Sequence, residues 1–167
     1  MPDKLIALMY QSWDDLDRAI SGLTPDEATE RHNGGSSIAW TVGHVTHMLD
    51  SWVVVRFDGL SPHRLISQPM FRTGGSGEAN DWPTIMAGVK EVRAAARRFL
   101  DSQEADLDHV IPYDGSIAFL RPVGLSLRYA LMRISAHHFI HVAEIVTVRS
   151  RLGHVIQDVP DWGRTLV

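Results

Sequence analysis

Four separate stretches of the sequence place mainly apolar residues three and four positions apart, and this spacing constrains the fold more than any other feature. The longest stretch is residues 127–152, where steps of four and three alternate throughout. Such a pattern gathers the apolar side chains along one face of an α-helix, as in helices that pack side by side. The other stretches are residues 5–23, 38–52 and 85–99. The sequence therefore predicts an all-α chain that forms a four-helix bundle.

The ends of these helices carry recognisable capping residues. Ser36 or Ser37 is the expected N-cap of the second helix, and Asp81 that of the third. Gly153 follows the last helix, where glycine commonly ends helices. Between the first two long helices, residues 24–27 have the pattern of a capping box, which predicts a further short helical turn.

Two connections are long and irregular. Residues 57–81 are rich in Gly and Pro, and loops of this length are often functional. In the second connection, Asp114 and Gly115 form a turn signal between two apolar runs, which predicts a small hairpin before the last helix. With such connections, a simple up-down-up-down order of helices is not assured. No repeat or low-complexity tract divides the chain, so a single domain over residues 1–167 is expected.

Composition narrows the classes of function. The net charge is -4 and no run of Lys and Arg appears, which argues against nucleic acid as a partner. The chain has no cysteine, so it forms neither a disulfide nor a zinc site built on thiolates. No apolar run reaches the roughly 20 residues of a membrane span, and the N-terminus lacks the core of a signal peptide. A cytoplasmic protein without a membrane partner is expected.

Histidines are concentrated on one side of the last predicted helix. His137 and His141 are four residues apart, so their imidazoles lie one helical turn apart and can reach the same metal ion. Apolar residues on either side of the pair indicate that it faces the interior of the bundle. A third ligand should come from another helix, and His44 is the best candidate. His47 points away from the apolar face of its helix and is expected to be surface or side packing.

Two neighbouring residues have several possible roles. His138 lies closer to the centre of the apolar face than His137, so it is a metal ligand, a substrate contact or a hydrogen-bonded core residue. Glu144 follows His141 by three residues. It is positioned to hydrogen-bond the second nitrogen of a ligand imidazole or to transfer a proton. An ion pair of Glu144 is equally open, with Arg128, Arg133 or Arg149.

Two segments resemble conserved motifs of a known family. The first is "SIAWTVGHVTHMLDSWV", with Trp40, His44 and Trp52 in characteristic spacing. The second is "AHHFIHVAEI", in which Ala143 stands where the family often has glycine. Together they resemble the DinB-like superfamily, which includes bacillithiol- and mycothiol-dependent S-transferases.

This resemblance implies a bundle with crossed connections and a divalent metal held by three histidines. By position in the motifs these are His44, His137 and His141, in preference to His47 and His138. It also implies a homodimer. Zinc and nickel both suit imidazole nitrogen.

A three-imidazole site with an open fourth position is typical of catalytic rather than structural metal sites. The resemblance favours an enzyme that transfers a low-molecular-weight thiol to an electrophilic small molecule, with Glu144 or His138 as the catalytic proton carrier. The alternatives are a hydrolase that uses metal-bound hydroxide, a non-catalytic binding bundle, and a bundle in which the histidines are core residues without a metal. Residues 57–81 and 109–120 are expected to shape the pocket. An acidic group of the cosubstrate would suit Arg121 or Arg133, between which the sequence does not choose.

Overall fold

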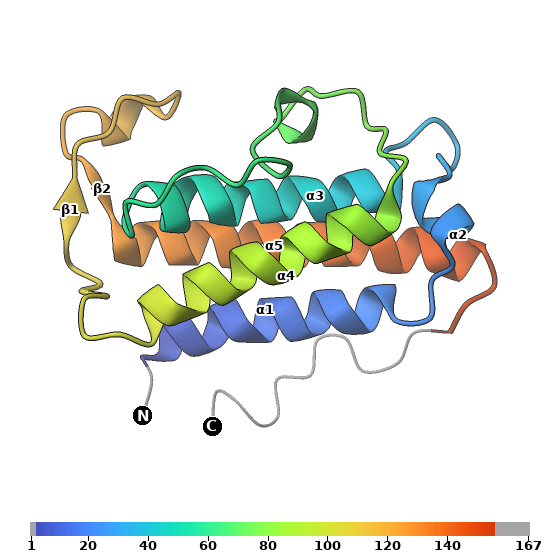
Figure 1. Cartoon of the computed structure of the whole chain (residues 1–167), viewed down its shortest axis with the longest axis horizontal. Coiled ribbons are helices and arrows are strands. Elements are labelled where there is room, and N and C mark those ends of the chain that lie inside the picture. The colour runs from blue at the N-terminus through green and yellow to red at the C-terminus, as the bar shows by residue number, and fades with distance from the viewer. Residues whose placement is uncertain (1–2, 156–167) are drawn as a thin grey trace.

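The computed structural model describes residues 3–155, and the long helices within them lie side by side (Figure 1). They are α1 (Lys4–Ile20), α3 (Ile38–Leu49), α4 (Trp82–Leu100) and α5 (Leu127–Arg151). The predicted all-α four-helix bundle is therefore confirmed. Residues 1–2 and 156–167 lie outside the described part, so a single domain over the whole chain stays a prediction.

The helices do not alternate in direction. In Figure 1, α1 and α5 run one way, whereas α3 and α4 run the other. The most extensive helix contacts join α1 to α5 and α3 to α4, and contacts between α3 and α5 connect these two pairs. Since α3 and α4 are parallel neighbours, the chain between them has to return along the length of the bundle. The long connection predicted at residues 57–81 serves this purpose.

Each long helix begins at a residue whose side chain accepts a hydrogen bond from a backbone N–H of the first turn, which satisfies a donor without an intrahelical partner. These caps are Asp3, Ser37, Asp81 and Ser126. Of the two serines considered for α3, Ser37 is therefore the cap. The short helix α2 (Pro25–Thr29) begins with the predicted capping box. Gly153 follows α5 with a φ of 88°, a conformation that favours glycine.

The second predicted helix contains a change of helical register. After α3 the chain continues as a π-helix, η1 (Asp50–Val55), in which Trp52, Val53 and Val54 are all buried. Asp50 at its start is only 1% exposed, and its carboxylate accepts a hydrogen bond of 3.1 Å from the backbone N–H of His63. The wider turn of a π-helix thus accommodates three consecutive buried side chains, those of Trp52, Val53 and Val54.

A small hairpin precedes α5, as predicted, but its turn lies elsewhere. Strands β1 (Val110–Ile111) and β2 (Leu125–Ser126) pair in antiparallel fashion. Asp114 and Gly115 do not join them directly, because the connection also contains the 3-10 helix η3 (Ala118–Leu120). The predicted turn was therefore wrong in position. Tyr113 is buried against Trp52, with ring centres 6.2 Å apart. The chain therefore turns into the core directly before Asp114 and Gly115, instead of continuing the strand into a tight turn.

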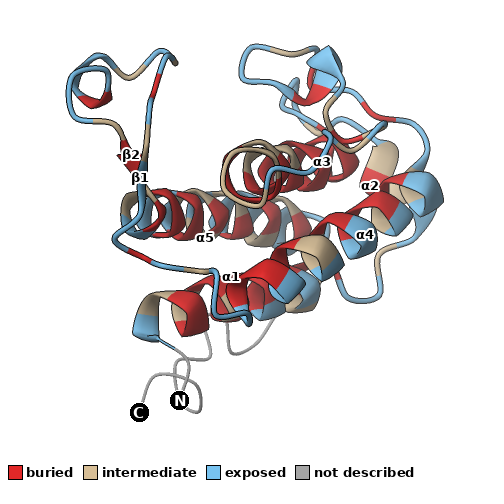
Figure 2. Ribbon diagram, turned by 60° about the vertical axis from the view of Figure 1, so that its left-hand side comes forward, coloured by how far each residue is buried: buried red, intermediate tan, exposed pale blue. Residues whose placement is uncertain are grey.

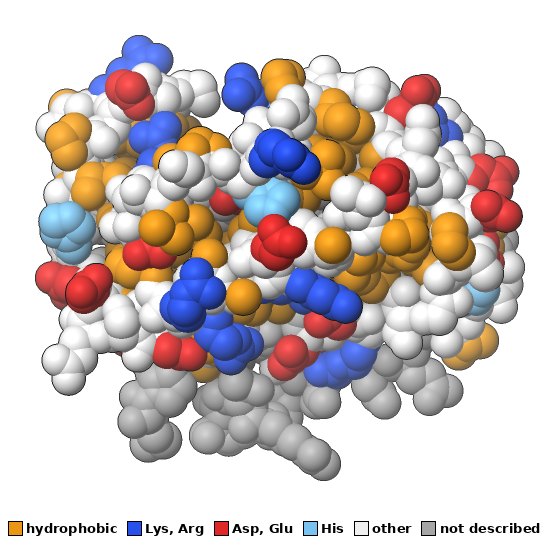
Figure 3. All heavy atoms as spheres, in the orientation of Figure 1, with side chains coloured by type: hydrophobic (Ala, Val, Ile, Leu, Met, Phe, Trp, Pro, Cys, Tyr) orange, Lys and Arg blue, Asp and Glu red, His pale blue; other side chains and the backbone are white. Residues whose placement is uncertain are grey.

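The core lies between the helices, where Figure 2 shows their buried sides facing one another. On the outer face formed by α4 and α1, acidic and basic side chains are interspersed (Figure 3). Within residues 3–155, no helix is both long and apolar enough to cross a bilayer.

Candidate metal centre

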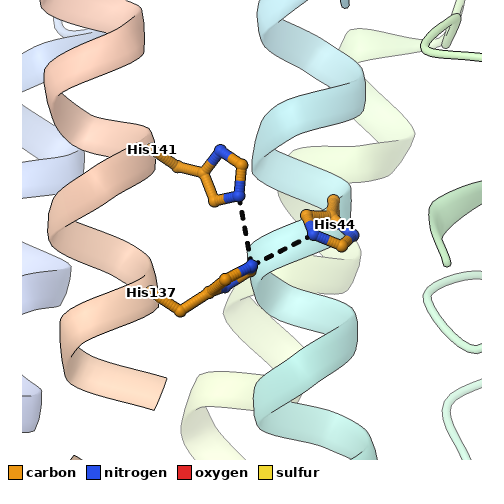
Figure 4. A group of neighbouring side chains, drawn as sticks. All are labelled: His44, His137 and His141. Carbon is orange, nitrogen blue, oxygen red and sulfur yellow. Dashed lines mark hydrogen bonds between the residues drawn. The ribbon is translucent and has the colours of Figure 1, made fainter. Parts of the chain in front are cut away.

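Three histidines converge between α3 and α5 (Figure 4). His44 comes from α3, and His137 and His141 come from consecutive turns of α5. The Nε2 atom of His137 lies 3.2 Å from Nε2 of His44 and 3.1 Å from Nε2 of His141. All three possible ligand atoms lie within 4.8 Å of one another. The three residues predicted as a set are thus brought together from two distant segments.

The outer nitrogens of two of these rings have hydrogen-bond acceptors. His44 Nδ1 donates to the carbonyl oxygen of Phe71 at 2.7 Å, and His141 Nδ1 donates to Oε2 of Glu144 at 2.6 Å. A neutral imidazole carries one proton, so these bonds leave the Nε2 lone pairs of both rings directed at the centre. His137 Nδ1 is buried and has no hydrogen-bond partner among the described residues.

The spacing of the three rings suits a metal ion. Imidazole nitrogens bind zinc at about 2.0–2.1 Å, and tetrahedral angles then place two such nitrogens about 3.3 Å apart. The two short Nε2 separations, 3.2 and 3.1 Å, are close to this value. Without a cation or a shared proton, inward lone pairs at such distances would repel one another. The cluster is therefore a candidate site for a divalent ion, with three protein ligands.

Burial favours the protonation state that binds metals. Removal from water lowers the pKa of His44 below its ordinary value. The pKa of His137 falls to about 4, chiefly through burial and further through the charges of His141 and His44. Both imidazoles are consequently neutral near pH 7, and only a neutral imidazole offers a lone pair to a metal.

Aromatic packing fixes the orientation of His44. Trp40 stacks on the imidazole with ring centres 4.8 Å apart and planes 8° from parallel. The indole Nε1 of Trp40 donates to the carbonyl of Met70 at 2.6 Å, next to the Phe71 carbonyl that accepts from His44. The Phe71 side chain is fully buried against Gly43, where an added Cβ would overlap its ring. The connection after η1 therefore closes over the α3 side of the site.

Glu144 is exposed and holds His141 in place through the bond described above. The alternative ion pairs are not observed within the described residues. Arg128 pairs with Asp108, and Arg149 donates to two backbone carbonyls at the end of α1. The geometry matches the first role considered for Glu144, orientation of a ligand imidazole. A role in proton transfer stays a prediction.

His138 lies outside the cluster and inside the core. It is 1% exposed, and its Nδ1 donates to the carbonyl of Ile134 at 3.0 Å. Burial lowers its pKa to about 3, so the ring is neutral. Its surroundings are those of a hydrogen-bonded core histidine, and its catalytic role stays a prediction. His47 is half-buried and donates to the carbonyl of Ile66 at 3.1 Å, which agrees with packing at the side of α3.

Two cavities lie near the site, and Ile140 borders both. Only one of them is lined by a histidine of the cluster, His137. The first, here called the His137 cavity, has a volume of about 500 Å³ and is bordered by His137, Arg133 and Thr73 together with mainly apolar side chains. The second, here called the Glu144 cavity, has a volume of about 510 Å³. Its wall combines polar and apolar groups, among them Glu144 and Thr41.

The segments expected to shape the pocket differ in their contribution. Residues 57–81 supply Thr73 to the His137 cavity, whereas residues 109–120 border neither of the two cavities. Arg121 lines a separate cavity beside the hairpin and donates to the carbonyl of Gly115 at 3.0 Å. Of the two arginines considered for an acidic ligand, only Arg133 lies beside the histidines.

These features define an all-α bundle with a three-histidine candidate metal site between two of its helices. The model of the DinB superfamily matches residues 8–145, which include α3, most of α5 and all three histidines. The chain belongs to the DinB superfamily. No curated protein matched the sequence.

Proposed function

We propose that this protein is a divalent-metal-dependent enzyme that transfers a low-molecular-weight thiol to an electrophilic small molecule. The proposal depends on one observation, the convergence of three Nε2 atoms from His44, His137 and His141. Three protein ligands leave a coordination position for a substrate atom, and zinc and nickel both suit the imidazole ligands. When bound, such an ion acts as a Lewis acid that stabilises a thiolate at neutral pH.

Two further features support a thiol cosubstrate. The chain contains no cysteine, so the sulfur nucleophile has to be supplied by another molecule. The cavity beside His137 and the cavity beside Glu144 provide separate places for two reactants. The more polar Glu144 cavity suits the thiol, and the His137 cavity suits the electrophile.

The protein's own residues then have distinct tasks. Phe71 and Trp40 hold His44, and Glu144 holds His141, so the imidazoles need little reorganisation on binding. Glu144 also borders the cavity assigned to the thiol and is the residue we propose to accept the S–H proton. A C–S bond forms as the leaving group of the electrophile departs with its electron pair.

The first experiment measures metal content by mass spectrometry. We expect about one divalent ion per chain in the untagged protein, and its loss in His44→Ala and in His137→Ala. His47→Ala is the matched control, because His47 lies on the same helix outside the cluster and should leave the metal in place. Absence of metal after incubation with zinc and nickel would refute the proposal.

A metal-dependent hydrolase is the competing function, since the same three histidines also suit activation of water. The two assays differ in their requirement for a thiol. Consumption of an electrophile such as monochlorobimane should depend on both metal and added thiol in a transferase. Metal-dependent cleavage of an ester without any thiol would favour the hydrolase.

A further inference from the structure

Arg133 lies in the wall of the His137 cavity, one helical turn before His137 on α5. The side chain is exposed, and its guanidinium carbon lies 5.9 Å from the ring centre of Trp52. This distance is within the range of a cation–π contact. Trp52 thereby supports the guanidinium from one side and leaves its N–H donors available to a ligand.

The charge of Arg133 is not neutralised within the described structure. Only some arginines of the described part have a carboxylate within ion-pair distance, namely Arg18, Arg31, Arg56, Arg93 and Arg128. Arg133 forms no ion pair with any residue of the described part of the chain. An unpaired guanidinium in the wall of a cavity is a ready partner for an anionic group, because its planar fork can bind both oxygens of a carboxylate.

The rest of the His137 cavity is mainly apolar. Met48, Tyr129, Met132 and Ile140 form most of its wall. A ligand that suits both the apolar wall and the guanidinium of Arg133 has an apolar body and one anionic group. Side chains four residues apart on a helix lie about 5–6 Å from each other at their Cβ atoms. An anionic group held by Arg133 would therefore place the adjoining part of the ligand beside His137.

We propose that the His137 cavity selects electrophiles with an apolar body and a carboxylate, and that Arg133 binds this carboxylate. The electrophilic character of the ligand rests on the proposed function, whereas the binding of an apolar carboxylate does not. Arg133 is accordingly a specificity residue.

The test uses binding and not turnover. In protein labelled with ¹³C at the methionine methyl groups, Met48 and Met132 report directly on the cavity. Their signals are assigned with Met48→Leu and Met132→Leu. Metal-free protein is titrated with 4-phenylbutyrate and with its uncharged amide, so that a bound metal cannot account for any preference for the carboxylate. We expect both methyl signals to shift, and the carboxylate to bind about tenfold more tightly than the amide.

Arg133→Gln should remove this preference while leaving the thermal unfolding curve unchanged. Arg98→Gln is the matched control, because it removes an exposed arginine from α4, outside the cavity. Equal binding of acid and amide, no shift of either methyl signal, or a preference that survives Arg133→Gln would each overturn the proposal. N-acetylcysteine is titrated in parallel. If its binding alone depends on Arg133, the anionic group belongs to the thiol and the proposal is wrong.

The result is independent of the proposed activity. Arg133-dependent binding without thiol-dependent turnover would retain the carboxylate site and refute the transferase. Thiol-dependent turnover without Arg133-dependent binding would support the transferase and refute the carboxylate site.

Discussion

The candidate site depends on Gly43, although glycine has no side chain that could bind a ligand. A methyl group at this position would overlap the ring of Phe71, whose carbonyl accepts the proton of His44 Nδ1. We expect Gly43→Ala to lower the free energy of unfolding by about 1–3 kcal/mol, as overpacked core positions do, and to weaken zinc binding. Urea unfolding and zinc titration measure the two effects. Phe71→Leu in the same chain should recover part of the loss, and simple additivity of the two substitutions would contradict this account.

The orientation of His141 by Glu144 gives a second prediction. Loss of such an outer partner typically weakens metal binding about 10–100-fold, so Glu144→Ala should have an effect of this size in competition with a chromophoric chelator. Glu144→Gln keeps an acceptor oxygen and should have a smaller effect. Glu91→Ala is the control, since Glu91 bonds His63 at 2.9 Å in a comparable pair away from the three histidines. Equal affinities of the wild type and Glu144→Ala would show that the bond does not matter.

The sequence predicted the three histidines better than their surroundings. Helical spacing paired His137 with His141 but left His138 open, and the resemblance selected His44, His137 and His141 as the set. The acceptor for His44 could not be predicted, because it is a backbone carbonyl placed by the path of a long irregular connection. Residues 57–81 were expected to shape the pocket, but nothing in the sequence singled out Thr73 as the residue among them that borders the His137 cavity.

Among the elements, the π-helix η1 contains a buried carboxyl group, Asp50, that lowers the free energy of unfolding in a pH-dependent way. Burial raises the pKa of the Asp50 carboxyl, although the N–H of His63 opposes this by hydrogen bonding. A raised native pKa means that ionised Asp50 destabilises the folded state at pH values above it. This cost disappears as the pH falls through the native pKa towards the ordinary carboxyl value of about 3.9.

Asp50→Asn should therefore be more stable than the wild type at pH 7, because asparagine keeps an acceptor for the N–H of His63 and carries no charge. The difference should shrink as the pH is lowered towards about 4. Urea unfolding of both proteins across this range is the measurement. A variant that is less stable at pH 7 would show that the ionised carboxylate makes a favourable interaction that burial does not outweigh.

The sequence predicted the ends of the helices better than the backbone conformation of the π-helix and the hairpin. Ser37, Asp81 and Gly153 act through local backbone geometry, which the sequence displays directly. The register change at Asp50 leaves no mark in the three-and-four spacing of α3. The misplaced hairpin turn has a tertiary cause, because burial of Tyr113 overrides the local preference of Asp114 and Gly115.

For the whole molecule, the candidate site joins the two parallel helix pairs, since His44 lies on α3 and the other two histidines on α5. A ligand that binds only the folded state stabilises it by about 2.7 kcal/mol at a hundredfold excess over Kd. We therefore expect zinc or nickel to raise Tm, and a chelator to lower it again, in calorimetry. His44→Ala should abolish the response, whereas His47→Ala should retain it. An unchanged Tm in the wild type would argue against a metal shared by the two pairs.

The arrangement of the site along α5 also bears on how such a protein diversifies. Arg133, His137, His141 and Glu144 stand on successive turns of one uninterrupted helix, so the proposed ligand selectivity and most of the metal-binding capacity are encoded in a stretch of about a dozen codons. Exchange of that stretch between relatives would transfer both properties in one genetic event. The receiving protein would have to supply His44 on α3 together with Trp40 and Gly43, on which the placement of His44 depends.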